Sequence, residues 1–257
     1  MAASDIEELF AKTLGGDYDD DAPWEAVHSL RRIGSRQVFE HAVKWVQSAD
    51  PVSRARGIDV LAQLGKTFEH RSNSFPEESY AVVTKALLQE RDLRPLNSAI
   101  AALGHLDDAR AVPLIVEFRS HPSAEIRFSV ACALGSFPND ALSVRTLLAL
   151  SEDSDEEVRD WATFGLGVQG DYDSPELRDA LSRRLMDANR NVREEAMAGL
   201  AKRLDTRVLP SLLDALTQPG ISDRVVEAAY TLLGLDHDRK EWSGRDYVIA
   251  LRQRFHA

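Results

Sequence analysis

The sequence has little of what a secreted, zinc-bound or membrane protein needs. It contains one cysteine in 257 residues, Cys132, so no internal disulfide can form, and no cysteine–histidine spacing typical of a zinc site is present. No apolar run reaches the roughly 18 residues of a membrane-spanning helix. Residues Met1–Asp5 lack the basic and apolar segments of a secretion signal, which favours a cytoplasmic location.

Aromatic residues and positive charge are also scarce. Only 7% of the residues are aromatic, and leucine and alanine dominate the apolar ones, which favours helices over sheets. The 42 acidic residues outnumber the 31 lysines and arginines, for a net charge of −11. A surface of this sign repels phosphate backbones, so we expect no nucleic-acid partner, whereas a basic protein could be attracted.

A repeat is present along most of the chain. Residues at i, i+4 and i+8 form one apolar stripe, and a glycine preceded by Leu or Ile follows it, as expected for a left-handed cap that ends a helix. These glycines are Gly34, Gly65, Gly104, Gly135, Gly167 and Gly234. The stripes recur about every 32 residues, with one interval longer by about seven around residues 66–75.

A second amphipathic segment follows each glycine, and strand-like alternation is absent. The clearest segments are Ala109–Arg119, Ala141–Leu150, Pro175–Met186 and Arg207–Leu216. Start signals include Asp50-Pro51, Asn139, Ser174-Pro175 and a capping box from Ser154 to Glu157. Each unit is therefore a helix–turn–helix hairpin that must stack on its neighbours to bury its stripe.

The ends of the chain differ from the repeats. Ser4–Leu14 is predicted to be an N-terminal helix with a capping box from Ser4 to Glu7, and residues 15–21 a flexible acidic linker. Residues 245–256 are predicted to be the last helix. We therefore expect two parts, residues 1–21 with the helix and linker and residues 22–257 with the repeats.

The later repeats share a motif. Glu125-Ile126-Arg127, Glu157-Val158-Arg159 and Asn191-Val192-Arg193 each precede an alanine and then a leucine. Over roughly residues 22–235 this string resembles the short bacterial HEAT repeat, the type also seen in phycocyanobilin lyase subunits. The resemblance implies an all-α solenoid of about seven HEAT-like helix pairs with a capping helix at each end. It also implies that these arginines form ion pairs between repeats; the alternative is that they bind an anion. The first three copies depart from the motif.

One candidate site lies in the fifth and sixth repeats. Gly165 and Gly199 occupy the same helical position, where earlier copies have alanine, and a glycine inside a helix costs about 0.5–1 kcal/mol relative to alanine. Close packing of a paired helix is one explanation. The other is a small cleft in which Trp161, Glu194 and Arg203 hold a ligand or peptide.

A second candidate surface is the outward face of the second helices, which in HEAT-like arrays line the concave side. Its residues are of mixed sign, which favours a polar protein interface over a phosphate track. They include Arg36, Arg145, Arg178, Ser182, Met186, Asp214 and Gln218.

Two other functions were weighed. Glu40-His41 and Glu69-His70 are similar, in reversed order, to the His-Glu pairs of HEAT-like deoxyhypusine hydroxylases, but the chain has two pairs instead of four. HEAT-like alkylation-repair glycosylases need a basic groove, which this acidic chain lacks. We therefore expect a non-enzymatic protein-binding scaffold with no cofactor or metal, the alternatives being a lyase- or hydroxylase-type enzyme or subunit and, third, a nucleic-acid binder.

Overall fold

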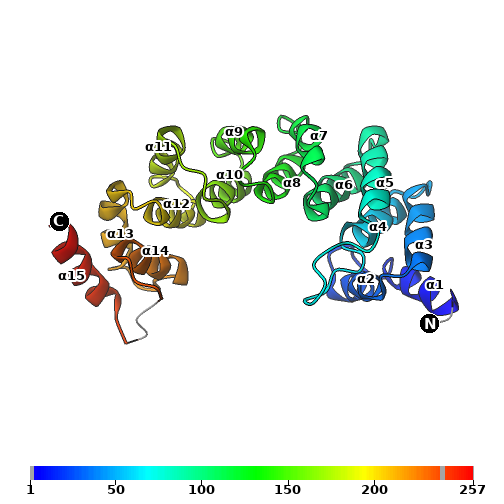
Figure 1. Cartoon of the computed structure of the whole chain (residues 1–257), viewed down its shortest axis with the longest axis horizontal. Helices are drawn as coiled ribbons and strands as arrows, with labels where there is room; N and C mark the ends of the chain where they lie inside the picture. The colour runs from blue at the N-terminus through cyan, green and yellow to red at the C-terminus, as the bar shows by residue number, and fades with distance from the viewer. Residues whose placement is uncertain (1–2, 238–240, 257) are drawn as a thin grey trace. The chain divides into compact units, whose positions relative to one another are not determined.

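The structure is a computed structural model that describes residues 3–237 and 241–256. Throughout these residues the regular structure is helical, as Figure 1 shows, which confirms the predicted all-α class of stacked helix pairs. The chain divides into two compact units, Met1–Phe137 and Pro138–Ala257, a division that the repeat pattern did not indicate.

The first unit holds the elements up to α8. They are α1 (Ala3–Lys12), α2 (Asp21–Ile33), α3 (Arg36–Val46), α4 (Pro51–Ala62), α5 (Pro76–Gln89), α6 (Leu93–Leu106), a 3-10 turn (Ala109–Ala111), α7 (Val112–Val116) and α8 (Ala124–Gly135). The second unit holds α9 (Ala141–Leu150), α10 (Glu156–Phe164), a π-helical turn (Gly165–Gln169), α11 (Pro175–Arg184), α12 (Arg190–Lys202), a 3-10 turn (Thr206–Val208), α13 (Leu209–Ala215), α14 (Asp223–Leu233) and α15 (Gly244–Phe255).

The helices of each unit form two layers. The first helices contact one another in succession, α4 with α6 and α6 with α8 in one unit, and α10 with α12 and α12 with α14 in the other. Each second helix packs on the first helix that follows it, as α11 does on α12 and α13 on α14. In each unit the first helices thus form a continuous layer, and the second helices pack on it.

The predicted apolar stripe is the core. Ile126, Val158, Val192 and Val225, one from each later repeat, are at most 1% exposed, and the leucine that ends each stripe is buried as well. Within each unit the first helices that carry these residues contact one another, as expected for repeats that cannot bury their stripe alone.

The repeat glycines do not all serve one purpose. Gly34 and Gly234, with φ of 58° and 71°, are the left-handed C-caps of α2 and α14, as expected. Gly65 also has a positive φ, 78°, but it lies three residues after the end of α4, and its N–H donates to the carbonyl of Arg31. Gly104 lies inside α6, and a Cβ on it would stand 2.8 Å from Cα of Ala133 in α8. Here the glycine is needed because two first helices approach closely, and not because a helix ends.

The start signals are mostly confirmed. Asp50 and Ser174 cap α4 and α11, accepting hydrogen bonds from the backbone N–H groups of Ser53 and Leu177. Asp155 caps α10 in place of the predicted Ser154, and Asp140 caps α9 in place of Asn139. Asp140 and Asp155 each accept hydrogen bonds from two backbone N–H groups. The predicted caps, Asn139 and Ser154, each lie one residue too early to do so. The box expected at Ser4 is not formed, because α1 already begins at Ala3.

The segment expected to be a flexible linker is anchored. Tyr18 Oη donates a hydrogen bond to the carboxylate of Asp59 on α4, and its ring lies 3.6 Å from the guanidinium carbon of Arg56. Arg56 is fully buried and donates to the carbonyls of Thr13 (2.9 Å) and Tyr18 (2.6 Å). Burial first and then the charge of Asp59 raise the pKa of Tyr18, so its hydroxyl remains a donor.

Four arginines form an equivalent set across the repeats, each four residues after the N-cap of a first helix. Nη1 of each donates to the backbone carbonyls five and six residues earlier; the four are Arg54, Arg127, Arg159 and Arg193. Arg54 also pairs with Glu90 (2.8 Å) and Arg159 with Asp187 (2.9 Å), each on the following repeat. We call this set the arginine ladder. Arg159 confirms the expected ion pair between repeats, and Arg54 extends the ladder to a repeat where the motif was not recognised.

Candidate functional site

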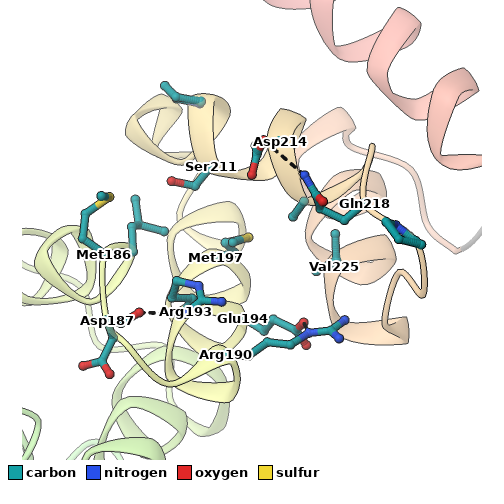
Figure 2. Close-up of a pocket in the computed structure, with 14 residues that line it drawn as sticks. Met186, Asp187, Arg190, Arg193, Glu194, Met197, Ser211, Asp214, Gln218 and Val225 are labelled. Atoms are coloured by element: carbon teal, nitrogen blue, oxygen red, sulfur yellow. Dashed lines mark hydrogen bonds and ion pairs between the residues drawn. The ribbon is translucent and has the colours of Figure 1, made fainter.

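A groove of about 610 Å³ opens in the second unit between the end of α11 and α13, with α12 as its floor. We call it the α11–α13 groove. Figure 2 shows Met186 and Asp187 on one wall, Ser211, Asp214 and Gln218 on the other, and Arg190, Arg193, Glu194 and Met197 along α12 between them.

Local sequence explains why these side chains meet. Arg190, Arg193, Glu194 and Met197 are spaced i, i+3, i+4 and i+7, so they lie on one face of α12. Helix α11 ends at Arg184, and the turn before the N-cap Asn189 leaves Met186 84% exposed. The buried Met197 and Leu185 make the floor apolar.

The charged groups of the groove are mostly engaged. Glu194, 9% exposed, accepts hydrogen bonds from Nε of Arg190 at 2.6 Å and from Oγ of Ser222 at 2.5 Å. The carboxylate of Asp187 forms ion pairs with Arg159 and Arg184. Burial by itself would raise the pKa of Asp187, but the hydrogen bond and charge of Arg159 hold it below its usual value, so this carboxylate stays ionised.

The cleft predicted from Trp161, Glu194 and Arg203 is not formed among the described residues. Glu194 lines the α11–α13 groove, and the other two do not. Trp161 lies on α10, 40% exposed, in an edge-to-face contact with Phe164 at 5.6 Å.

Arg203 instead stabilises the backbone. Its guanidinium, 9% exposed, donates to the carbonyls of Leu166, Gly167, Gly199 and Tyr172 at 2.6–3.2 Å. Two of these carbonyls belong to the π-helical turn, where the normal helical bonding pattern is interrupted. Burial lowers the pKa of Arg203, and the nearby Asp173 opposes that effect.

Packing explains the glycines of this region. A Cβ on Gly199 would stand 2.6 Å from Cα of Gly167, so α12 and the π-helical turn touch through bare backbone. The contact partner of Gly199 is thus Gly167, two residues after the Gly165 that occupies the equivalent position in the preceding repeat.

The predicted arginines of the second helices lie in separate places. Arg36 on α3 pairs with Glu78 at 2.8 Å and lies over the ring of Phe75. Arg178 on α11 pairs with Asp173 at 2.6 Å and Asp205 at 3.5 Å, and Arg145 is exposed on α9. None of the three lines the α11–α13 groove, whereas Met186, Asp214 and Gln218 from the same predicted face do.

Sequence reasoning missed Arg190, Met197 and Ser211. Their spacing from Glu194 and Asp214 can be seen in the sequence. However, α12 was predicted to lie in the buried layer, and its face is exposed in the groove only because α11 and α13 stand apart.

The groups that suggested chemistry do not converge. His41 stacks between Phe10 (4.3 Å) and Trp45, and burial lowers its pKa, while His70 is exposed in the loop after α4. Within residues 3–237 and 241–256 no three His, Cys, Asp or Glu side chains are placed to share a metal ion. Burial raises the pKa of Cys132 to about 12, so the thiol is protonated near neutral pH.

The described helices include none that is both long and apolar enough to cross a membrane.

Comparison with known proteins identifies the type of repeat. A family model described as HEAT repeats matches residues 80–167 and 144–234. The protein YibA of Escherichia coli (strain K12) is 37% identical over 217 residues, which cover 79% of this chain and 75% of YibA. The phycocyanobilin lyase subunit alpha of Thermosynechococcus vestitus is 27% identical over 146 residues, covering 56% of this chain and 53% of that subunit.

A solved structure gives the same answer for the fold. The X-ray structure of Escherichia coli YibA superposes with a TM-score of 0.72 over 99% of this chain and 96% of that one. The identity over this superposition is 22%.

Proposed function

The chain belongs to the HEAT-repeat family, and from this premise we propose that it is a non-enzymatic scaffold that binds a segment of a partner protein in the α11–α13 groove. The partner contacts come from the second helices and from the face of α12 between them. The occupant is a protein segment and not a nucleic acid, because the chain carries a net charge of −11 and the groove combines an apolar floor with charges of both signs.

One observation carries this proposal: the exposed Met186 stands beside a groove whose floor is the buried Met197. An exposed, flexible thioether beside an apolar depression is typical of surfaces that receive an apolar side chain. The surrounding Asp214, Gln218 and Arg190 supply a polar rim, as protein interfaces have.

The experiment is partner capture with a blocked groove. Ser211→Trp fills the groove, and Glu176→Trp places the same bulk on an exposed residue in the first turn of α11, outside it. We expect a stoichiometric protein partner to be recovered from native extract by the wild-type chain and by Glu176→Trp, and lost with Ser211→Trp. Equal recovery with both variants contradicts binding in this groove.

A second function is favoured by one observation, the match to phycocyanobilin lyase subunit alpha. On this alternative the chain is an enzyme subunit that handles a chromophore or other small ligand. Absorbance spectra and metal analysis of the protein purified from its native host distinguish the two: the scaffold carries no chromophore and no stoichiometric iron or zinc, whereas a subunit of the lyase type acquires an absorbing ligand.

A further inference from the structure

Arg54 and Arg159 of the arginine ladder have an acidic partner at the same position of the following repeat. Where the next first helix begins, the residue two places before its N-cap is Glu90, Asp153 or Asp187, and each accepts a backbone N–H of the turn through its own carboxylate. Glu90 receives Nε and Nη2 of Arg54 at 2.8 and 3.0 Å, and Asp187 receives Nε and Nη2 of Arg159 at 2.9 and 3.0 Å. The guanidinium of Arg54 or Arg159 thus uses Nη1 for the carbonyls of its own turn, and Nε with Nη2 for the carboxylate of the next repeat.

The last step of the ladder lacks this acid. Helix α14 has Ser222 as N-cap, so the equivalent position is Gly220. Arg193 places Nη1 on the carbonyls of Asp187 and Ala188 at 2.7 and 2.9 Å, as the other ladder arginines do. Among residues 3–237 and 241–256, however, its Nε and Nη2 meet no acceptor.

The open edge of Arg193 belongs to the α11–α13 groove. Arg193, Gln218 and Pro219 all line it, and Figure 2 shows Arg193 in its centre between Met186 and Met197. The groove's own carboxylates are committed elsewhere: Asp187 to Arg159 and Arg184, Glu194 to Arg190 and Ser222, and Asp214 faces Nε2 of Gln218 at 3.4 Å. A half-buried guanidinium with two aligned donors and no acid in reach is a site for a carboxylate.

We propose that Arg193 binds the side-chain carboxylate of an Asp or Glu in the partner segment, which supplies in trans the ladder acid that Gly220 omits. The inference rests on the proposed function and adds the chemistry of the partner. Since the guanidinium stands beside the apolar floor of Met197 and Leu185, the segment that fits carries its acid next to a large apolar residue.

The geometry is tested without any partner by restoring the acid in cis. Gly220 has φ of +73° with open space around its Cβ position, and Asp and Asn are both among the residues that most often adopt this backbone region. Gly220→Asp and its matched control Gly220→Asn have side chains of the same shape and differ in charge. At low salt we expect Tm to be about 2 °C higher for Gly220→Asp than for Gly220→Asn, and the difference to vanish when Arg193→Gln is added. An equal Tm for the two variants, or a difference that survives Arg193→Gln, overturns the proposal.

Binding is tested with a displayed library of random 12-residue peptides selected on the full chain. We expect enrichment of Asp or Glu beside a bulky apolar residue, and about 30-fold weaker binding of those peptides to Arg193→Gln and to Gly220→Asp but not to Gly220→Asn.

The other outcomes separate the two proposals. Peptides that are blocked by Ser211→Trp yet lack an acid and bind Arg193→Gln equally well overturn the carboxylate site and leave groove binding intact. A selection in which no peptide is blocked by Ser211→Trp contradicts both.

Discussion

Gly167 and Gly199 meet backbone to backbone, so that a Cβ on Gly199 would stand 2.6 Å from Cα of Gly167 and 2.9 Å from a methyl of Leu181. This contact allows the backbone of α12 to approach the π-helical turn closely in the second unit. Neither glycine has a positive φ, so the constraint is the distance between helices.

We predict that Gly199→Ala lowers the free energy of unfolding by about 1–3 kcal/mol, because the added methyl forces the two backbones apart. The gain in helix propensity of about 1 kcal/mol offsets only part of this loss. Urea denaturation measures it. The control is Gly15→Ala, where the nearest atom to the new Cβ is 3.5 Å away, and we expect a change within about 0.5 kcal/mol there. A neutral or stabilising Gly199→Ala contradicts the close contact.

Arg203→Met should cost about 3 kcal/mol, since it leaves several buried carbonyls without their donor. The loss is expected to be local, with hydrogen exchange accelerating first in residues 165–172, the segment whose carbonyls Arg203 holds. Arg183→Met, which removes an exposed arginine paired with Glu152, is the control and should leave this segment unchanged. Unaltered exchange in residues 165–172 after Arg203→Met would refute the assignment.

Glu195 predicts a pH dependence. Burial first and then the nearby Asp160 and Glu227 raise its pKa to about 7, against the opposing charge of Arg224. One of its carboxylate oxygens and one of Asp160 are buried with no hydrogen-bond partner among the described residues. Because the folded pKa is higher than the unfolded one, the folded state binds the proton more tightly, so this group destabilises the protein progressively as pH rises from about 4.5 to 7.

We therefore expect Glu195→Gln to raise the free energy of unfolding by about 1–2 kcal/mol at pH 8 and by much less at pH 4.5. Denaturant unfolding at the two pH values measures it, with the exposed Glu176→Gln as control. If Glu195→Gln destabilises the protein at pH 8, the ion pair with Arg224 at 3.2 Å outweighs the desolvation and the prediction fails.

Arg56→Met tests the anchored N-terminal segment. The substitution removes the donors to Thr13 and Tyr18 and leaves the carboxylate of Asp59 buried, so we expect residues 13–20 to lose protection from hydrogen exchange and α1 to loosen from α2. Arg94→Met removes an exposed arginine whose guanidinium carbon lies 4.2 Å from the centre of the Tyr18 ring, and it is the control. Equal exchange of residues 13–20 in both variants contradicts the anchoring role of Arg56.

The repeat, its helices and its core could be read from the sequence because they depend on local spacing. Val158, Val192 and Val225 are buried as their stripes predicted, and α9 has the predicted bounds of Ala141–Leu150. A glycine after leucine, in contrast, fits both a helix cap and a close helix contact, so the roles of Gly34 and Gly104 could not be separated without the neighbouring helix.

The ladder and the groove were predicted only in part. The second repeat was predicted to depart from the motif, whereas the cap at Asp50 with Arg54 four residues later is the signal that assigns it to the ladder. Met186, Asp214 and Gln218 were correctly placed on an outward face, but the separation of α11 and α13, which exposes Arg193 and Met197 between them, depends on packing between repeats. Arg203 was predicted to face a ligand. Its true partners, the carbonyls of the π-helical turn, could not be recognised from the sequence around it.

The most direct test of segment binding is amide hydrogen exchange of the full chain with and without a saturating peptide selected as above. The account predicts added protection in residues 185–197 and 209–218, the walls and floor of the groove, and the same pattern reduced in Ser211→Trp. Protection confined to other helices, or none at a concentration that saturates binding, would contradict it.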